Sequence, residues 1–140
     1  FAGRNSRLDT IQAAILNIKI KDYGKVLKIR NDHARIYMKK LSNIKNLKLF
    51  ELNNKNTHCF HQFVIKTNKR NNLRNFLKKN KIETMVHYPY MLNELKFFNN
   101  KQKLKNSHFL GKKILSLPIS EEHTKKEINF VANRICAFFK

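Results

Sequence analysis

The sequence predicts an α+β fold, in which a mixed sheet carries helices mainly on one face and follows long helices at the N-terminus. Three observations support this class. Apolar residues recur at helical spacing over residues 8–41, apolar runs of strand length follow, and further helical patterns separate those runs. The order is two helices, strand, helix, strand, helix, short strand and helix, which predicts one small sheet covered by helices.

Two helices are expected at the N-terminal end, over about residues 8–23 and then on to about residue 41. Gly3 permits a turn before the first helix, and Asn5 or Ser6 is placed to cap it. The apolar stripe of the first helix is Leu8, Ile11, Ile15 and Ile18. One side of the second helix carries Val26, Ile29, His33, Ile36, Tyr37 and Leu41.

Residues 59–67 form the clearest predicted strand. Alternate positions on both of its faces are largely apolar, which favours a strand covered on most of both faces. Residues 47–52 form a short strand or an extended link. A second strand is predicted over residues 82–87, ended by Tyr88 and Pro89, and residues 115–119 are expected to be extended.

Capping residues place the remaining helices. Asn71 or Asn72 is placed to cap a helix through residue 77, and Asn80 is expected as the left-handed residue that follows it. Residues 107–115 are expected to be helical. Thr124 and Glu127 form a capping-box pattern that opens the last helix. The apolar stripe of that helix is Ile128, Val131, Ile135 and Phe138.

Composition is strongly basic, with 30 Lys and Arg against 9 Asp and Glu, a net charge of +21. Such a field attracts polyanions. The basic residues are scattered among Asn and Lys clusters. This distribution favours compositional drift of solvent-exposed residues over a nucleic-acid-binding surface, so nucleic acid is not the expected partner. No apolar run approaches the roughly 20 residues that span a bilayer. Cys59 and Cys136 read as reduced thiols in a cytoplasmic protein.

Taken alone, the residues predict no catalytic constellation and no metal site. There is no Gly-rich phosphate loop, no paired carboxylates and no Cys/His/Asp cluster with ligand spacing. His61 lies inside the predicted strand, where a packed histidine is the usual reading. His87 and Tyr88, at a predicted strand end, are the best-placed candidates, because functional side chains gather in loops after strands.

Five motifs in order resemble the DegT/DnrJ/StrS family of pyridoxal-phosphate-dependent sugar aminotransferases. The opening pattern G-x-N-S-R-L-D-x-x-Q-A-A occupies residues 3–14. The later ones are R-x-x-x-A-x-x-Y at 30–37, H-x-Y-H-Q-Y-V-I at 58–65, I-x-T-x-x-H-Y-P at 82–89, and L-S-L-P-I at 115–119 with the Thr124 and Glu127 ending. Residues 60 and 63 are both Phe where the family has Tyr.

The resemblance implies the C-terminal part of such an enzyme. Residues 1–42 would hold the end of the large-domain motif and the connecting helices, and residues 43–140 the C-terminal small domain of a fold-type I aminotransferase. The complete enzyme would form a homodimer and use pyridoxal 5′-phosphate. It would transfer an amino group, with glutamate as the expected donor, to a keto-deoxysugar on a nucleoside diphosphate. The segment lacks the reactive lysine and would be inactive alone.

The resemblance also implies site residues. Asn5 would reach across the dimer to the cofactor phosphate, which suits an amide donor, although a helix cap is its plain alternative. Arg7 would contact the cofactor phosphate or the substrate diphosphate, or else pair with Asp9. His87 and Tyr88 would line the sugar-nucleotide pocket.

Two rival hypotheses remain open from the sequence. The first is a basic nucleic-acid-binding domain, in which aromatic residues would stack on bases; its candidates are Phe60, Phe63, Tyr88 and Tyr90. The second is a non-catalytic remnant that dimerises with an intact aminotransferase. The observation that supports it is the segment at residues 90–93, where the second Pro and the second His that usually follow H-Y-P in the family are missing.

Overall fold

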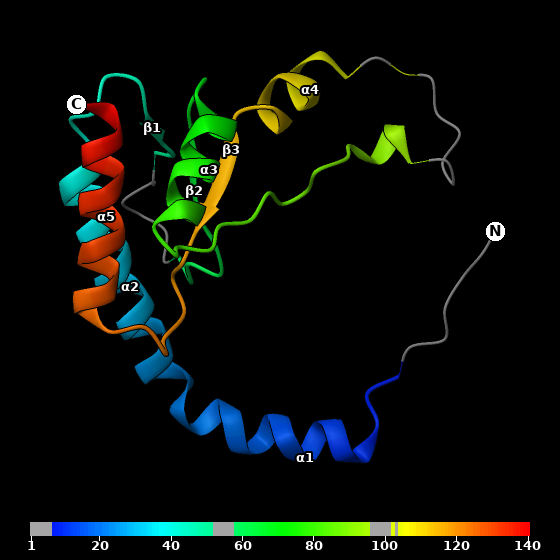
Figure 1. Cartoon of the computed structure of the whole chain (residues 1–140). Coiled ribbons are helices and arrows are strands. Elements are labelled where there is room, and N and C mark those ends of the chain that lie inside the picture. The colour runs from blue at the N-terminus through cyan, green and yellow to red at the C-terminus, as the bar shows by residue number, and fades with distance from the viewer. Residues whose placement is uncertain (1–6, 52–57, 96–101, 103) are drawn as a thin grey trace.

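A computed structural model describes residues 7–51, 58–95, 102 and 104–140 (Figure 1). The helices are α1 (Thr10–Lys19), α2 (Tyr23–Leu41), α3 (Arg70–Lys79), α4 (Lys105–Gly111) and α5 (Lys125–Phe139), with 3-10 turns η1 (Ile20–Asp22) and η2 (Leu92–Glu94). The strands are β1 (Lys48–Leu49), β2 (Phe63–Lys66) and β3 (Ile114–Leu117). No helix in these ranges is long and apolar enough to cross a bilayer.

The three strands form one sheet in the order β1-β2-β3, and both pairings are antiparallel. The α+β class is confirmed, while the sheet within the described residues is antiparallel rather than mixed. Phe63 pairs with Leu117 and Ile65 with Leu115. Because side chains alternate along a strand, these four residues point to the same face.

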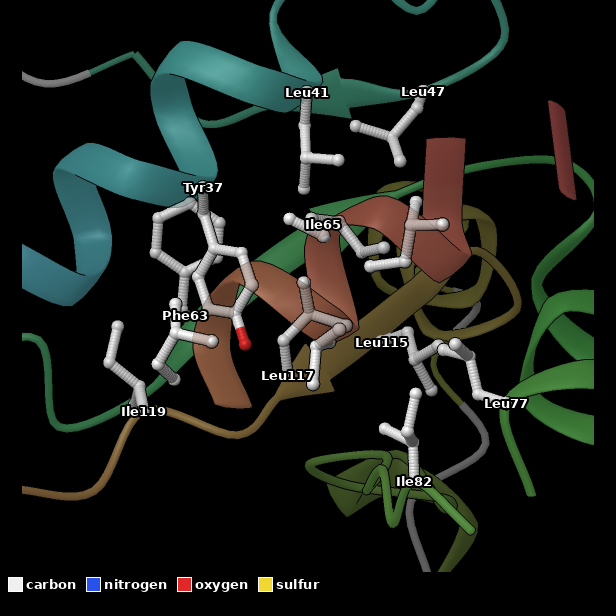
Figure 2. Close-up of a cluster of buried hydrophobic side chains, with 14 of the residues drawn as sticks. Tyr37, Leu41, Leu47, Phe63, Ile65, Leu77, Ile82, Leu115, Leu117 and Ile119 are labelled. Carbon is white, nitrogen blue, oxygen red and sulfur yellow. The ribbon is translucent and has the colours of Figure 1, made fainter. Parts of the chain in front are cut away.

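That face is covered by helices, as the sequence predicted. Helix α2 packs along α5, and α3 contacts both α5 and β3. Figure 2 shows Tyr37 and Leu41 of α2 meeting Phe63, Ile65 and Leu117 of the strands. These side chains are all at most 5% exposed, so α2 shares its core with the sheet.

Helix α1 extends away from the sheet (Figure 1) and has no buried residue. Its predicted stripe is exposed, with Ile11 at 75% and Ile18 at 69%. The N-cap is Asp9, whose Oδ1 accepts a hydrogen bond from the Gln12 backbone N–H at 2.8 Å. The expected caps, Asn5 and Ser6, lie outside the described residues.

The predicted strand at residues 82–87 is wrong in extent. Only one bridge forms there, between Met85 and Ser116. In that register the next hydrogen-bonded pair would join Glu83 to Pro118, and proline has no N–H to donate. The pairing therefore does not extend from Met85 back toward Glu83, and the segment touches the β3 edge at one bridge.

Several element ends also differ from the prediction. Strand β2 begins at Phe63 because Phe60 has a positive φ of 45°, which interrupts the extended chain. Asn80 is not left-handed: its side chain donates to the Phe76 carbonyl at 2.9 Å, and Lys81 takes the positive φ of 60° instead.

At α3 the N-cap is Lys69, so Asn71 and Asn72 lie within the first turn. The predicted helix at residues 107–115 is observed as α4 at 105–111, and its expected last residues belong to β3. Helix α5 begins as expected, with the Thr124 and Glu127 capping box.

Candidate functional site

A cleft of about 780 Å³ lies within the described residues. Its walls are the chain at residues 80–87, the end of β3 with the turn that follows, and the first turns of α5. Three imidazoles, those of His61, His87 and His123, stand on this wall. His61 is exposed just before β2 rather than packed within a strand.

His87 is held in the cleft wall by β3. The backbones of Met85 and Ser116 exchange two hydrogen bonds, of 3.2 and 2.8 Å, and fix the chain two residues before the imidazole. The His87 Nδ1 then lies 2.9 Å from the Ser116 Oγ. Ser116 is only 7% exposed, so this contact is sheltered from water. Because Nδ1 is occupied, Nε2 is the ring nitrogen available to a ligand.

Tyr88 stands beside His87 but faces solvent. The two rings meet edge to face, with centroids 5.7 Å apart, and the Tyr88 side chain is 70% exposed. Arg7 is exposed and precedes α1, which extends away from the sheet. The described chain thus brings His87 and Tyr88 together and leaves Arg7 apart from them. Asn5 lies outside the described residues.

The turn after β3 is clamped to α2 by two side chains of the R-x-x-x-A-x-x-Y pattern. Arg30 pairs with Glu121, with Nη2 and Nε 2.7 and 2.8 Å from Oε2. The Tyr37 hydroxyl donates to the Pro118 carbonyl at 2.8 Å. The Glu121 backbone N–H and the Arg30 guanidinium hold the pKa of the Glu121 carboxyl below its ordinary value. The pattern is visible in the sequence, but its role is not. The two side chains shape one wall of the cleft.

His33 lies under the same turn and was counted correctly with the buried side of α2. It is 1% exposed, and burial lowers its pKa, so the neutral imidazole is favoured. Its Nδ1 has no hydrogen-bond partner in the described part of the chain. The residue supports the turn and does not reach the cleft surface.

The described residues do not form a cradle for pyridoxal phosphate by themselves. None of the lysines in the described ranges is buried, so none has the desolvated site that is one way to lower the pKa of a reactive amine. The expected cofactor contact, Asn5, is outside those ranges. Nor does the described part of the chain gather three residues that could hold a metal ion.

The base-stacking surface required by the nucleic-acid hypothesis is incomplete. Phe60 and Phe63 are each 5% exposed and belong to the core. Tyr88 and Tyr90 are exposed, at 70% and 68%. Two of the four aromatic rings are therefore unavailable to bases, and the prediction that all four could stack is wrong.

Comparison with known proteins assigns the family. The model of the DegT/DnrJ/EryC1/StrS aminotransferase family matches residues 1–136, and the chain belongs to this family. A pleiotropic regulatory protein of Geobacillus stearothermophilus is 33% identical over 99% of this chain and 39% of its own length. A dTDP-3-amino-3,6-dideoxy-alpha-D-galactopyranose transaminase of Aneurinibacillus thermoaerophilus is 31% identical over 96% of this chain and 38% of its own.

Solved structures agree on the fold. A DegT DnrJ EryC1 StrS aminotransferase from Brucella abortus superposes with a TM-score of 0.87, at 28% identity, over 98% of this chain and 37% of its own. DesV of S. venezuelae has a TM-score of 0.90 at 24% identity, over 100% of this chain and 39% of its own. The chain thus spans about two fifths of the length of the curated relatives it matches.

Proposed function

We propose that this chain is the C-terminal, sugar-recognising part of a pyridoxal-phosphate-dependent aminotransferase that acts on a nucleotide-linked keto-deoxysugar. The observation that carries the proposal is the fixed His87 in the wall of the 780 Å³ cleft. Family membership supports the reaction class. The transaminase name of the Aneurinibacillus relative supports a deoxysugar nucleotide as the substrate class.

In this proposal the His87 imidazole orients the sugar nucleotide. With the Ser116 hydroxyl donating to Nδ1, Nε2 carries the proton and donates to a sugar hydroxyl or a phosphate oxygen. Tyr88 offers an exposed ring beside it on which a sugar face can pack. Neither residue moves a proton in the transfer itself, so both are binding residues.

Of the remaining parts, Arg7 alone lies within the described residues. Pyridoxal 5′-phosphate, when bound, supplies the electron sink and carries the amino group between donor and acceptor. We place the reactive lysine upstream of Phe1. Asn5 would donate its amide to the cofactor phosphate in the second subunit of a homodimer, and Arg7 would contact a phosphate group nearby.

The test uses the longer polypeptide that contains the proposed upstream lysine, called the complete polypeptide below. It measures the two half-reactions separately. The probe is dTDP-3-amino-3,6-dideoxy-α-D-galactopyranose, supplied as amino donor to 2-oxoglutarate. Replacing His87→Ala should raise KM for this sugar by about tenfold, the effect of losing one hydrogen bond to a charged group. The rate at which glutamate alone changes the cofactor absorbance should stay within about twofold, because His87 does not touch the amino acid in this proposal.

Half-buried His108 on α4, which contacts Glu94, offers a control histidine outside the cleft lining. His108→Ala should leave both rates unchanged. A complete polypeptide that never transfers an amino group from glutamate would contradict the proposal and favour the non-catalytic remnant. An equal loss of both half-reactions in His87→Ala would remove His87 from sugar recognition.

A further inference from the structure

A second hollow, of about 400 Å³, lies where β2 ends and β3 begins. It shares no lining residue with the cleft that holds His87. Five of its nine lining residues are lysines, and none is acidic. We refer to it as the lysine hollow; its lysines are Lys45, Lys48, Lys66, Lys69 and Lys113.

The fold gathers these lysines from distant parts of the chain. Lys48 and Lys66 are direct partners in the antiparallel register of β1 and β2. Lys113 is held through its backbone, because its carbonyl accepts from the Thr67 N–H at 3.0 Å and its own N–H donates to the Leu110 carbonyl at 2.8 Å. Its Nζ lies 3.5 Å from the centroid of the Phe109 ring, which fixes the ammonium on the wall of the hollow.

The ligand-free hollow carries two electrostatic costs. Like charges directly opposite each other on neighbouring strands repel, as at Lys48 and Lys66. In addition, none of the five ammonium groups forms an ion pair with a carboxylate in the described part of the chain. A bound anion would relieve both.

The start of α3 adds a third feature at the same place. Its N-cap, Lys69, lines the hollow, and no side chain caps the helix. The Thr67 hydroxyl accepts from the Lys69 N–H at 3.2 Å, so that hydroxyl is turned toward the helix start. The first turn of α3 thus has no side-chain cap for its backbone N–H groups, and the positive end of the helix dipole lies next to the hollow at Lys69.

We propose that the lysine hollow is a binding site for a compact anion that carries several phosphate groups, such as an inorganic or nucleoside polyphosphate. The size of the hollow lies within the range of small-molecule pockets, and its charge is gathered in one place rather than along a groove that would follow a nucleic-acid backbone. The inference does not depend on the proposed aminotransferase activity.

The experiment is calorimetric titration of the complete polypeptide with tripolyphosphate at about 150 mM salt, where diffuse attraction is largely screened. Replacing both Lys48→Gln and Lys66→Gln should weaken binding about tenfold or more. The matched control replaces Lys28→Gln and Lys126→Gln, two exposed lysines that line neither hollow. It removes the same charge and should change the affinity by less than about twofold.

Thermal melting provides a readout that needs no binding model. Tripolyphosphate should raise Tm of the natural protein and of the control pair, and at the same concentration should raise Tm of the Lys48 and Lys66 pair clearly less. Without ligand that pair should melt no lower than the natural protein, because its substitutions remove a repulsion.

Equal weakening by both pairs, or the absence of saturable binding, would overturn the proposal. A single-stranded oligonucleotide that binds through Lys48 and Lys66 and resists displacement by tripolyphosphate would overturn it in favour of nucleic acid.

Discussion

At the scale of single residues, Ser116 governs the orientation of the proposed sugar contact. Its hydroxyl is 2.9 Å from His87 Nδ1, and its backbone fixes Met85. Ser116→Ala keeps the backbone bridge and removes only the hydroxyl. We expect KM for the sugar nucleotide to rise about fivefold, the loss of one neutral hydrogen bond, while the half-reaction with glutamate is unchanged.

Steady-state kinetics on the complete polypeptide measures this effect. Ser116→Thr retains a hydroxyl and should restore much of the lost affinity, whereas Ser42→Ala, at an exposed serine after α2, should change nothing. If Ser116→Thr were as impaired as Ser116→Ala, or if kcat fell in both half-reactions, Ser116 would act through the fold and not through His87.

The same scale shows why part of the site escaped sequence reasoning. His87 and Tyr88 are adjacent members of the I-x-T-x-x-H-Y-P pattern, so the sequence alone was enough to propose both. Ser116, by contrast, is 29 positions from His87, and Glu121 is 91 positions from Arg30. No local pattern shows which distant hydroxyl or carboxylate a side chain will meet. The Met85–Ser116 bridge decides the first contact, and the packing of α2 against the turn after β3 decides the second.

At the scale of elements, α5 depends on its capping box. The Thr124 Oγ1 accepts from the Glu127 N–H at 3.2 Å, and the Glu127 carboxylate accepts from the Thr124 N–H at 2.7 Å. The first turn leads directly into buried Ile128. Thr124→Ala should therefore lower the free energy of unfolding by about 1 kcal/mol, measured by urea denaturation. A loss below about 0.3 kcal/mol would show that packing alone sets the start of α5.

The pH dependence of stability tests the same cap. Hydrogen bonds from Thr124 lower the pKa of Glu127 in the folded state. A lowered folded pKa adds stability above the unfolded value of about 4.3, and that stability is lost as the pH falls through the folded pKa. Thr124→Ala removes the side-chain hydrogen bond to the carboxylate and keeps the backbone one, so its difference from the natural protein should be largest near neutral pH and should narrow in acid without vanishing, because the bond from the Glu127 N–H to Oγ1 does not titrate. A difference that stayed constant down to about pH 2 would contradict this origin.

Element prediction succeeded where the cue was local and failed where it was not. The helical stripes and the Thr124 capping box are read within a few residues, and α2 and α5 follow them closely. The predicted strand at 82–87 is only one bridge, and Pro118 prevents that bridge from extending toward Glu83. Asn80 carried the local sign of a left-handed residue, yet its bond to the Phe76 carbonyl moved that conformation to Lys81.

At the scale of the whole molecule, two parts of the chain differ in how well they are buried. Helices α2, α3 and α5 and the sheet share a closed core, whereas every residue of α1 is unburied and its apolar side chains are exposed. The relatives are more than twice as long as this chain. The division at residue 42 stays a prediction, although α2 joins the core that includes the strands.

This arrangement predicts the behaviour of residues 1–140 prepared alone. The core should unfold cooperatively, because it does not depend on α1, but the segment should not transfer amino groups. In our proposal the reactive lysine is not among these residues, and none of their described lysines is buried. Exposed lysines will still add pyridoxal phosphate without specificity, so absorbance on adding the cofactor is not the decisive signal. The decisive signal is a change in that absorbance when glutamate is added, which the complete polypeptide should show and residues 1–140 should not. Turnover by residues 1–140 would mean that a lysine within them serves as the reactive amine.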